Sequence, residues 1–340
     1  MKTYKAIEIT SPGKLNLVER TLREPQAGQV RLRVEAAGIC HTDVFAVEGQ
    51  WPGLKYPLVP GHEIAGRIDA VGADVKVWKV GQRVGVGWFG GQCYVCEPCR
   101  RGDFINCIRL IIPGITTDGG YAESVIVEAR ALAAIPDALT ADDAAPLLCA
   151  GVTTYNALRN AKLRAGNVVA IQGIGGLGHL GVQFARRMGF YTIAIARGTE
   201  KQPLALELGA HKYIDSNAED PAKALQAIGG AEAILATAAS GKSIAPLVGG
   251  LKARGQLIVV GVSAEPVEIT TPQLITGMKT IAGSAAGTAI DIEDTLRFSC
   301  LQHVHSMNEV VSLEQAPEAY AKMAKNAARF RMVLKINPAG

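Results

Sequence analysis

The sequence has no long apolar segment. No run of about 18 apolar residues, the length needed to span a membrane, occurs in its 340 residues. The basic residues near the N-terminus are not followed by an apolar stretch of signal-peptide length. We therefore expect no membrane partner and a cytoplasmic location, where thiols stay reduced and seven cysteines favour metal or catalytic roles over disulfides.

The sequence also lacks runs of like charge. Its 35 Lys and Arg residues against 31 Asp and Glu residues leave a net charge of +4. Surfaces that bind nucleic acid gather Lys and Arg on one face, so no nucleic-acid partner is expected. Hydrophobic residues make up 48% of the chain, which is typical of a globular protein with a sizeable core, and the length indicates about two domains.

Two patterns meet near residue 150. Before it, short β-like runs at 30–34, 63–68 and 83–86 are separated by Gly and Pro, which predicts a β-rich domain. From about residue 167, apolar runs alternate with helical segments, which predicts a doubly wound parallel sheet of the dinucleotide-binding type. The predicted strands of that sheet are 168–171, 192–196, 213–214, 233–236, 257–260 and 280–282. The alternation ends near residue 287, and the tail predicts helices at 291–301 and 316–325 and a strand at 330–336.

A glycine-rich motif marks the first turn of that sheet. Gly173, Gly175 and Gly178 have the spacing G-x-G-x-x-G, with an apolar strand before them and an amphipathic helix after them. Such glycines allow a tight turn and let backbone N–H groups reach a pyrophosphate at the helix N-terminus. The alternative is a strand-to-helix turn of purely structural importance.

The end of the next strand indicates which dinucleotide binds. Sites that prefer NAD usually have Asp or Glu there, bonded to the ribose 2′-OH, but this chain has Arg197, with Lys201 close behind. Both cations can pair with a 2′-phosphate, so we predict a preference for NADP(H). The alternative is NAD(H), with the two side chains merely solvated at a helix start.

Six cysteines and a histidine suggest two metal sites. Four of the cysteines fall within fifteen residues, a spacing typical of a closed structural zinc site, with an iron–sulfur cluster as the alternative: Cys93, Cys96, Cys99 and Cys107. Cys40, His62 and Cys149 together offer the three N and S ligands of an open catalytic zinc site. Each of these three is also compatible with an ordinary core position, and their spacing alone does not establish a site.

Five motifs in order resemble the zinc-containing medium-chain alcohol dehydrogenases over essentially the whole chain. They are 38–43 (GICHTD), 60–63 (PGHE), the four-cysteine loop, 149–153 (CAGVT) and 173–178 (GIGGLG). The segments 194–198 and 328–334 are similar to the cinnamyl-alcohol-dehydrogenase-like branch, which often uses NADP(H).

The resemblance implies a role for particular residues. Cys40, His62 and Cys149 would hold the catalytic zinc, making two zinc ions per chain with the structural one. Asp43 would orient the ring of His62, Thr42 would relay the substrate proton, and Glu63 would be an acid that can approach the metal. The implied cofactor contacts are His41 and Arg331 at the pyrophosphate, the loop residues Gly173, Gly175, Gly176, Leu177 and Gly178, and Thr153, Val260 and Val262 near the nicotinamide. Trp51 and Trp88 match positions that line the substrate pocket, although ordinary core aromatics are an equally good interpretation.

The resemblance also implies a fold and a reaction. We expect a GroES-like catalytic domain at 1–150 and 287–340, a Rossmann coenzyme domain at 151–286, and a homotetramer or homodimer. The expected reaction is reversible hydride transfer between a primary aliphatic, allylic or aromatic alcohol and NAD(P), with zinc as the Lewis acid. The alternatives are a quinone or enoyl reductase of the same superfamily and a non-catalytic zinc-binding protein.

One position departs from the family pattern. Many relatives have a His three residues after the relay hydroxyl, where it exchanges the proton with solvent, but this chain has Phe45. We expect the relay to end differently and alcohol oxidation to need a higher pH. The remaining cysteine, Cys300, belongs to no motif and is interpreted as an incidental thiol.

Overall fold

The structure is a computed structural model that describes residues 1–337. It divides into two compact units, Met1–Val152 with Ala286–Gly340 and Thr153–Ala285. The boundaries expected from the sequence, 1–150 with 287–340 and 151–286, lie one or two residues from these limits. The chain therefore leaves the first unit once and returns to it for the tail.

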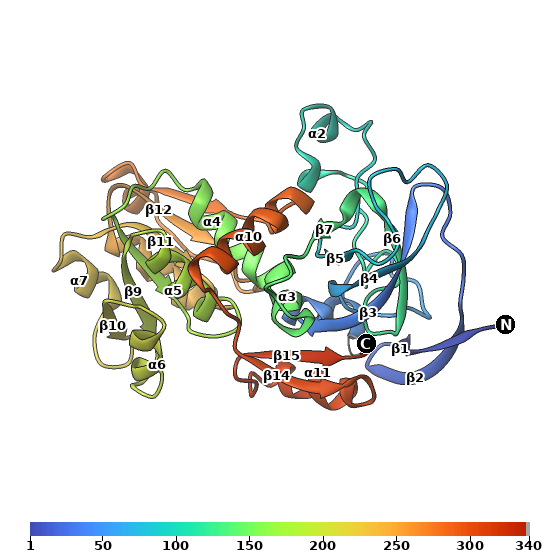
Figure 1. Cartoon of the computed structure of the whole chain (residues 1–340). Coiled ribbons are helices and arrows are strands. Elements are labelled where there is room, and N and C mark those ends of the chain that lie inside the picture. Colours follow the sequence, from blue (N-terminus) through green and yellow to red (C-terminus); the bar gives the residue numbers. More distant parts are fainter. Residues whose placement is uncertain (338–340) are drawn as a thin grey trace. The chain divides into compact units, whose positions relative to one another are not determined.

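The first unit is built on a mixed seven-stranded sheet in the order β14-β15-β3-β4-β5-β7, with β6 beside β3 (Figure 1). Its central strand β3 pairs with β6 along its first half and with β15 along its second half. Most of β3 is buried, and its two buried charged residues, Arg31 and Glu35, form ion pairs with Asp69 and Arg67. The strand bounds are β3 (Gln29–Ile39), β4 (Glu63–Val71), β5 (Arg83–Val86), β6 (Ser124–Glu128), β7 (Ala133–Ala134), β14 (Asn308–Ser312) and β15 (Arg331–Lys335).

A separate hairpin precedes this sheet. Strands β1 (Thr3–Ser11) and β2 (Lys14–Thr21) pair antiparallel around a turn in which Gly13 has a φ of +77°. That conformation suits glycine, since it has no Cβ. Neither this hairpin nor the strand β14, whose residues are only partly buried, was predicted from the sequence.

Short helices connect the strands of the first unit. The ones that matter for the site are the 3₁₀ turn η1 (His41–Asp43), the helix α2 (Glu97–Arg100) and the π-helical turn η4 (Leu147–Gly151). The other α-helices of this unit are α1 (Val44–Val47), α3 (Ala141–Pro146), α10 (Ala289–Gln302) and α11 (Ala316–Ala324). The helices predicted at 291–301 and 316–325 and the strand predicted at 330–336 correspond to α10, α11 and β15.

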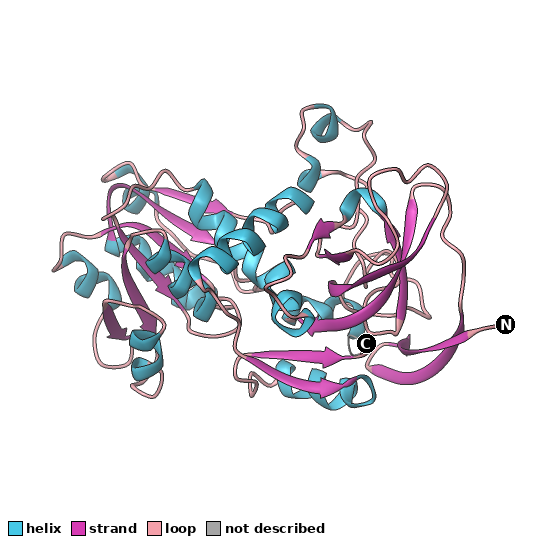
Figure 2. Cartoon of the chain, in the orientation of Figure 1, coloured by secondary structure: helices cyan, strands magenta, loops and turns pink. Residues whose placement is uncertain are grey.

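The second unit is a six-stranded, all-parallel sheet in the order β10-β9-β8-β11-β12-β13. Numbered from β8, this order is 3-2-1-4-5-6, that of the doubly wound dinucleotide fold, so the predicted fold class is confirmed. Figure 2 shows helices lying along its strands. The strands are β8 (Val168–Gln172), β9 (Tyr191–Ala196), β10 (Lys212–Asp215), β11 (Ala231–Ala236), β12 (Leu251–Val259) and β13 (Thr280–Gly283). The helices are α4 (Val152–Asn160), which begins at the unit boundary, α5 (Gly178–Arg187), α6 (Gln202–Glu207), α7 (Pro221–Gln226), α8 (Gly241–Ile244) and α9 (Thr271–Ile275).

Within residues 1–337, the helices are too short or too polar to cross a membrane.

Candidate metal centres and dinucleotide loop

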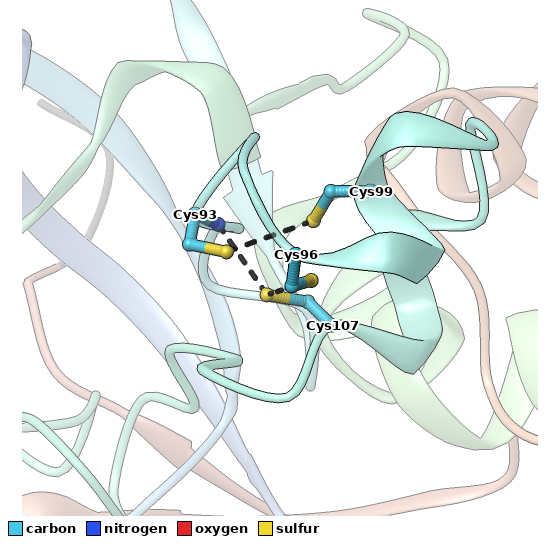
Figure 3. Close-up of side chains that lie close together, drawn as sticks. All are labelled: Cys93, Cys96, Cys99 and Cys107. Carbon is cyan, nitrogen blue, oxygen red and sulfur yellow. Dashed lines mark hydrogen bonds between the residues drawn. The ribbon is translucent and has the colours of Figure 1, made fainter.

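The four-cysteine loop closes around a single point. Its sulfur atoms all lie within 4.8 Å of one another, and three of the four cysteines are buried (Figure 3). Cys93 Sγ is 4.0 Å from Cys99 Sγ, and Cys96 Sγ is 3.9 Å from Cys107 Sγ. The short helix α2, which begins after Cys96, turns Cys99 back toward the other sulfurs. The predicted cluster is therefore present as a compact tetrad of thiols.

Backbone amides stabilise negative charge on these sulfurs. The N–H groups of Cys93 and Arg109 donate to Cys107 Sγ at 3.3 and 3.4 Å. A hydrogen bond from the Val95 amide is the main cause that lowers the pKa of Cys93 to about 6. Amides aimed at sulfur favour the thiolate, which is the form that binds metal.

The second cluster brings together three distant parts of the first unit. Cys40 precedes η1, His62 lies just before β4, and Cys149 lies in the middle of η4. With Glu63, their potential ligand atoms all lie within 4.8 Å of one another, and the two sulfurs are 4.0 Å apart. This trio was expected from its residue types and the family resemblance, and the fold brings the three side chains together.

The π-helical turn explains how Cys149 reaches the cluster. Pro146 ends α3 and has no N–H to donate, so a regular ladder of helical hydrogen bonds cannot continue through it. The chain widens into η4 instead, and such π turns are frequent at functional sites. The turn is completely buried, which fixes the direction of the thiol.

The two buried thiols of this cluster divide the charge unequally. A hydrogen bond from Cys149 is the largest cause that lowers the pKa of Cys40 well below its usual value. The same bond raises the pKa of Cys149. This hydrogen bond therefore favours the thiolate on Cys40 and the thiol on Cys149.

Polar groups surround His62 on both sides of its ring. Thr42 Oγ1 donates to Cys40 Sγ at 3.1 Å and lies 3.1 Å from His62 Nε2. On the other side, Asp43 Oδ1 is 2.9 Å from His62 Nδ1, although the ring N–H is not well aligned with it. Asp43 Oδ2 accepts hydrogen bonds from the Cys40 amide at 2.9 Å and from the Tyr121 hydroxyl at 2.6 Å. Tyr121 was not identified from the sequence, because tyrosine is not a metal-ligand type and follows no metal-site spacing.

An ion pair restrains the side chain of Glu63. Its carboxylate bonds the guanidinium of Arg331 on β15, and both side chains are almost fully buried. Burial raises the pKa of Glu63 to about 8, although the charge of Arg331 acts in the opposite direction. Arg331 was expected from the sequence at the cofactor pyrophosphate, but its ion pair with Glu63 was not, because the two residues are 268 positions apart.

Aromatic rings line one side of the cluster. Trp88 makes an edge contact with the His62 ring, with centroids 5.1 Å apart. Trp51 contacts Trp88 at 5.9 Å and Phe45 at 6.1 Å, also edge to face. All three aromatic side chains are partly buried and pack against the core of the first unit. An apolar aromatic wall therefore begins directly at His62.

The glycine loop has the geometry that an anion needs. Gly173 has a φ of +89°, and a Cβ on Gly178 would lie 1.7 Å from Gly173 O, so neither position accepts a side chain without movement. Within residues 1–337, the amides of Gly175, Gly176 and Leu177 have no hydrogen-bond partner. Helix α5 begins directly after them, and free amides at a helix N-terminus favour a phosphate.

The other predicted cofactor residues lie on both units. Arg197 is exposed after β9, and Lys201 Nζ donates to Ile174 O of the glycine loop at 2.9 Å. Val260 and Val262 follow β12, whose end aligns with the ends of β8 and β11 at one sheet edge. Thr153 is buried on α4, whereas His41 is exposed on η1.

Comparison with known proteins defines the class of this chain. Residues 26–137 match the alcohol dehydrogenase GroES-like domain, and residues 176–300 match the zinc-binding dehydrogenase domain. An alcohol dehydrogenase of Penicillium expansum is 41% identical over 98% of this chain and 97% of its own. A cinnamyl alcohol dehydrogenase structure from Sorghum bicolor has a TM-score of 0.90 at 33% identity, with 98% of both chains covered.

Two further solved structures contain a cofactor. A Helicobacter pylori cinnamyl alcohol dehydrogenase complexed with NADP(H) has a TM-score of 0.86 at 26% identity, covering 98% of both chains. An acetophenone reductase of Geotrichum candidum in complex with NAD has a TM-score of 0.85 at 26% identity, covering 98% of this chain and 97% of its own. The fold and the site define a two-unit oxidoreductase of the medium-chain type. The chain belongs to the zinc-binding alcohol dehydrogenases, which confirms the family expected from its motifs.

Proposed function

We propose that the chain interconverts primary alcohols and aldehydes with NADP(H), using a catalytic zinc on Cys40, His62 and Cys149. A second, structural zinc is held by Cys93, Cys96, Cys99 and Cys107. The observation that carries the proposal is the cluster of two sulfurs and one imidazole, with the Thr42 hydroxyl 3.1 Å from both Cys40 Sγ and His62 Nε2.

The spacing of the sulfurs fits zinc. Ligands at about 2.3 Å in a tetrahedron lie about 3.8 Å from one another. The sulfur pairs at 3.9–4.0 Å in both clusters agree with this edge. In a multi-iron cluster the thiolates bind separate irons and spread further apart, so the iron–sulfur alternative for the four-cysteine loop is disfavoured. Three protein ligands in the second cluster leave a position for substrate, as a catalytic zinc requires.

The side chains around His62 support proton transfer. Zinc on this ligand set supplies the Lewis acidity that stabilises negative charge on the substrate oxygen. Thr42 accepts the substrate proton and passes it on, because its hydroxyl both donates and accepts. Asp43 holds the tautomer of His62. Glu63, which has a carboxylate oxygen within 4.8 Å of the potential ligand atoms of Cys40, His62 and Cys149, is the acid that can approach the metal.

The dinucleotide contacts follow from the glycine loop and the sheet edge. The free amides of Gly175, Gly176 and Leu177 bind the pyrophosphate, with Gly173 and Gly178 allowing the turn. His41 and Arg331 assist at the pyrophosphate, and Thr153, Val260 and Val262 position the nicotinamide. Arg197 and Lys201 pair with a 2′-phosphate, which supports NADP(H) over NAD(H). The aromatic wall of Trp51 and Trp88 favours allylic and aromatic substrates over small aliphatic ones.

The assembly that we propose is a homotetramer, with a homodimer as the alternative, and its mass in solution decides between them. The seven unpaired cysteines suit a reducing compartment such as the cytoplasm.

Zinc content and activity test the function together. We expect two zinc ions per purified chain and loss of benzyl alcohol oxidation once a chelator has removed the zinc from Cys40, His62 and Cys149. A single zinc per chain would instead favour a non-catalytic zinc-binding protein, and full activity after complete zinc removal would refute the proposal. A panel of aliphatic, allylic and benzylic alcohols, each assayed with both cofactors, defines the substrate class and the preferred nucleotide.

A further inference from the structure

Tyr121 is a fully buried tyrosine whose backbone is fixed on both sides. Its amide donates to Pro60 O at 3.0 Å, and its carbonyl accepts from the Ile7 amide of β1 at 2.8 Å. The preceding residue extends this pairing, since the Gly120 amide donates to Gly61 O at 2.9 Å. The segment that contains Tyr121 is therefore joined by backbone hydrogen bonds to the segment that leads into His62.

The ring of Tyr121 lies directly against Gly61. A Cβ on Gly61 would be 2.3 Å from Cδ1 of the ring, and Gly61 has a φ of +99°. Only glycine combines that backbone angle with so close an approach. The ring thus supports the backbone one residue before His62.

The hydroxyl of Tyr121 reaches the carboxylate behind the same histidine. It donates to Asp43 Oδ2 at 2.6 Å, and the Cys40 amide donates to the same oxygen at 2.9 Å. With Oδ2 held by two donors, Oδ1 is left beside His62 Nδ1, 2.9 Å away. A phenol keeps its proton at neutral pH, so this donor is always available.

We infer that Tyr121 is a positioning residue of the catalytic metal centre, which acts through Asp43 to fix the orientation and tautomer of His62. The inference rests on the proposed role of His62 as a zinc ligand. Partners behind a metal-bound histidine tune metal affinity about 10- to 100-fold, and a group one step further out belongs at the lower end of that range. Tyr121 thereby links two otherwise separate supports, the Gly61 backbone and the Asp43 carboxylate.

The variant Tyr121→Phe tests this role, with Tyr320→Phe as the matched control. Tyr320 also donates its hydroxyl to a carboxylate in the first unit, that of Glu48 at 3.0 Å, and Glu48 belongs to neither cysteine cluster. We expect zinc to leave the catalytic site of Y121F about tenfold faster than that of Y320F when a chelator is added. In the cobalt-substituted proteins, the visible absorption bands should shift in Y121F alone. Equal zinc-loss rates and unchanged bands in folded Y121F would overturn the inference.

A double variant shows whether Tyr121 acts through Asp43. If it does, adding Y121F to Asp43→Asn should change the rate of zinc loss by less than twofold, because the group through which Tyr121 acts has already been altered. A further tenfold increase would contradict action through Asp43.

Two results keep the inference separate from the proposed function. Wild-type protein with one zinc per chain refutes the proposed function before any variant is measured, whereas two zinc ions with Y121F equal to Y320F refutes only the role of Tyr121. If Y121F does not fold, 3-fluorotyrosine introduced at position 121 alone keeps the ring and hydroxyl. Its ¹⁹F resonance should move on zinc removal, and a resonance that stays in place would also overturn the inference.

Discussion

The two cysteine clusters of the first unit are assembled in opposite ways. The loop Cys93–Cys107 supplies four sulfurs from one short stretch, closed by local turns and the helix α2. The other cluster takes Cys40, His62 and Cys149 from separate elements, and its sulfurs come from residues 109 positions apart. A contiguous loop can form its metal site almost by itself, whereas the dispersed cluster exists only once the seven-stranded sheet and η4 are in place. The first therefore suits a structural ion and the second a catalytic one.

Removing one cysteine from each cluster is the strongest test of whether the two clusters differ in function. We expect Cys149→Ala to lose one zinc and at least about 10³ in kcat/KM, because several kcal/mol of charge stabilisation are removed, with little change in melting temperature. Cys107→Ala should also lose one zinc but should lower the melting temperature by about 10 °C, because a structural ion contributes folding free energy. Its kcat/KM at low temperature should stay within about threefold of wild type. Zinc content, calorimetry and steady-state kinetics measure the three quantities.

If both variants lost activity equally while keeping the wild-type melting temperature, the division into a structural and a catalytic ion would be wrong.

The same contrast decides how much could be predicted from the sequence. The four-cysteine loop and the glycine motif are each formed by residues close together in sequence, so their spacing predicted both. The apolar runs predicted the parallel sheet and its strands. The dispersed trio needed the family resemblance, since no spacing rule joins Cys40 to Cys149. Partners that depend on tertiary packing were missed: the Tyr121–Asp43 bond and the Glu63–Arg331 pair join residues 78 and 268 positions apart. The hairpin β1–β2 was also missed.

Two glycine variants test the glycine loop of the second unit, which, like the four-cysteine loop, is formed by residues close together in sequence. Gly178→Ala puts a methyl group 1.7 Å from Gly173 O, so the loop must move. We expect cofactor KM to rise about 100-fold and thermal stability to fall. Gly175→Ala meets no protein atom within 4 Å and serves as the control, because its methyl group obstructs only the approach of the pyrophosphate. Its cofactor KM should rise while its melting temperature stays unchanged. A G178A protein with wild-type stability and KM would show that this close approach has no importance.

Arg197→Ala tests whether the residue after β9 selects the cofactor. An exposed charge-assisted hydrogen bond to phosphate should contribute about tenfold, so kcat/KM for NADP⁺ should fall by that factor while the value for NAD⁺ stays constant. Arg187→Ala, at the exposed end of α5, is the control and should affect neither value. Equal losses with both nucleotides would assign Arg197 to general binding, and a wild-type preference for NAD⁺ would refute the predicted selectivity.

Phe45→His should have the smallest effect, and it concerns how the dispersed site exchanges its proton with solvent. Phe45 lies three residues after Thr42, half-buried against Trp51, and has no group that can take up a proton. Without such a base the wild-type rate of alcohol oxidation should rise steadily with pH, since hydroxide must take the proton. The ordinary pKa of an imidazole is about 6.5, so a histidine side chain is expected to accept the proton in place of hydroxide around neutral pH. F45H should then oxidise alcohol a few-fold faster than wild type at pH 7, with little difference at pH 10, because hydroxide is abundant there.

Phe45→Leu keeps the position apolar and should leave the shape of the pH profile unchanged. Coincident profiles for F45H and F45L would mean that the proton leaves Thr42 by a route that does not pass residue 45.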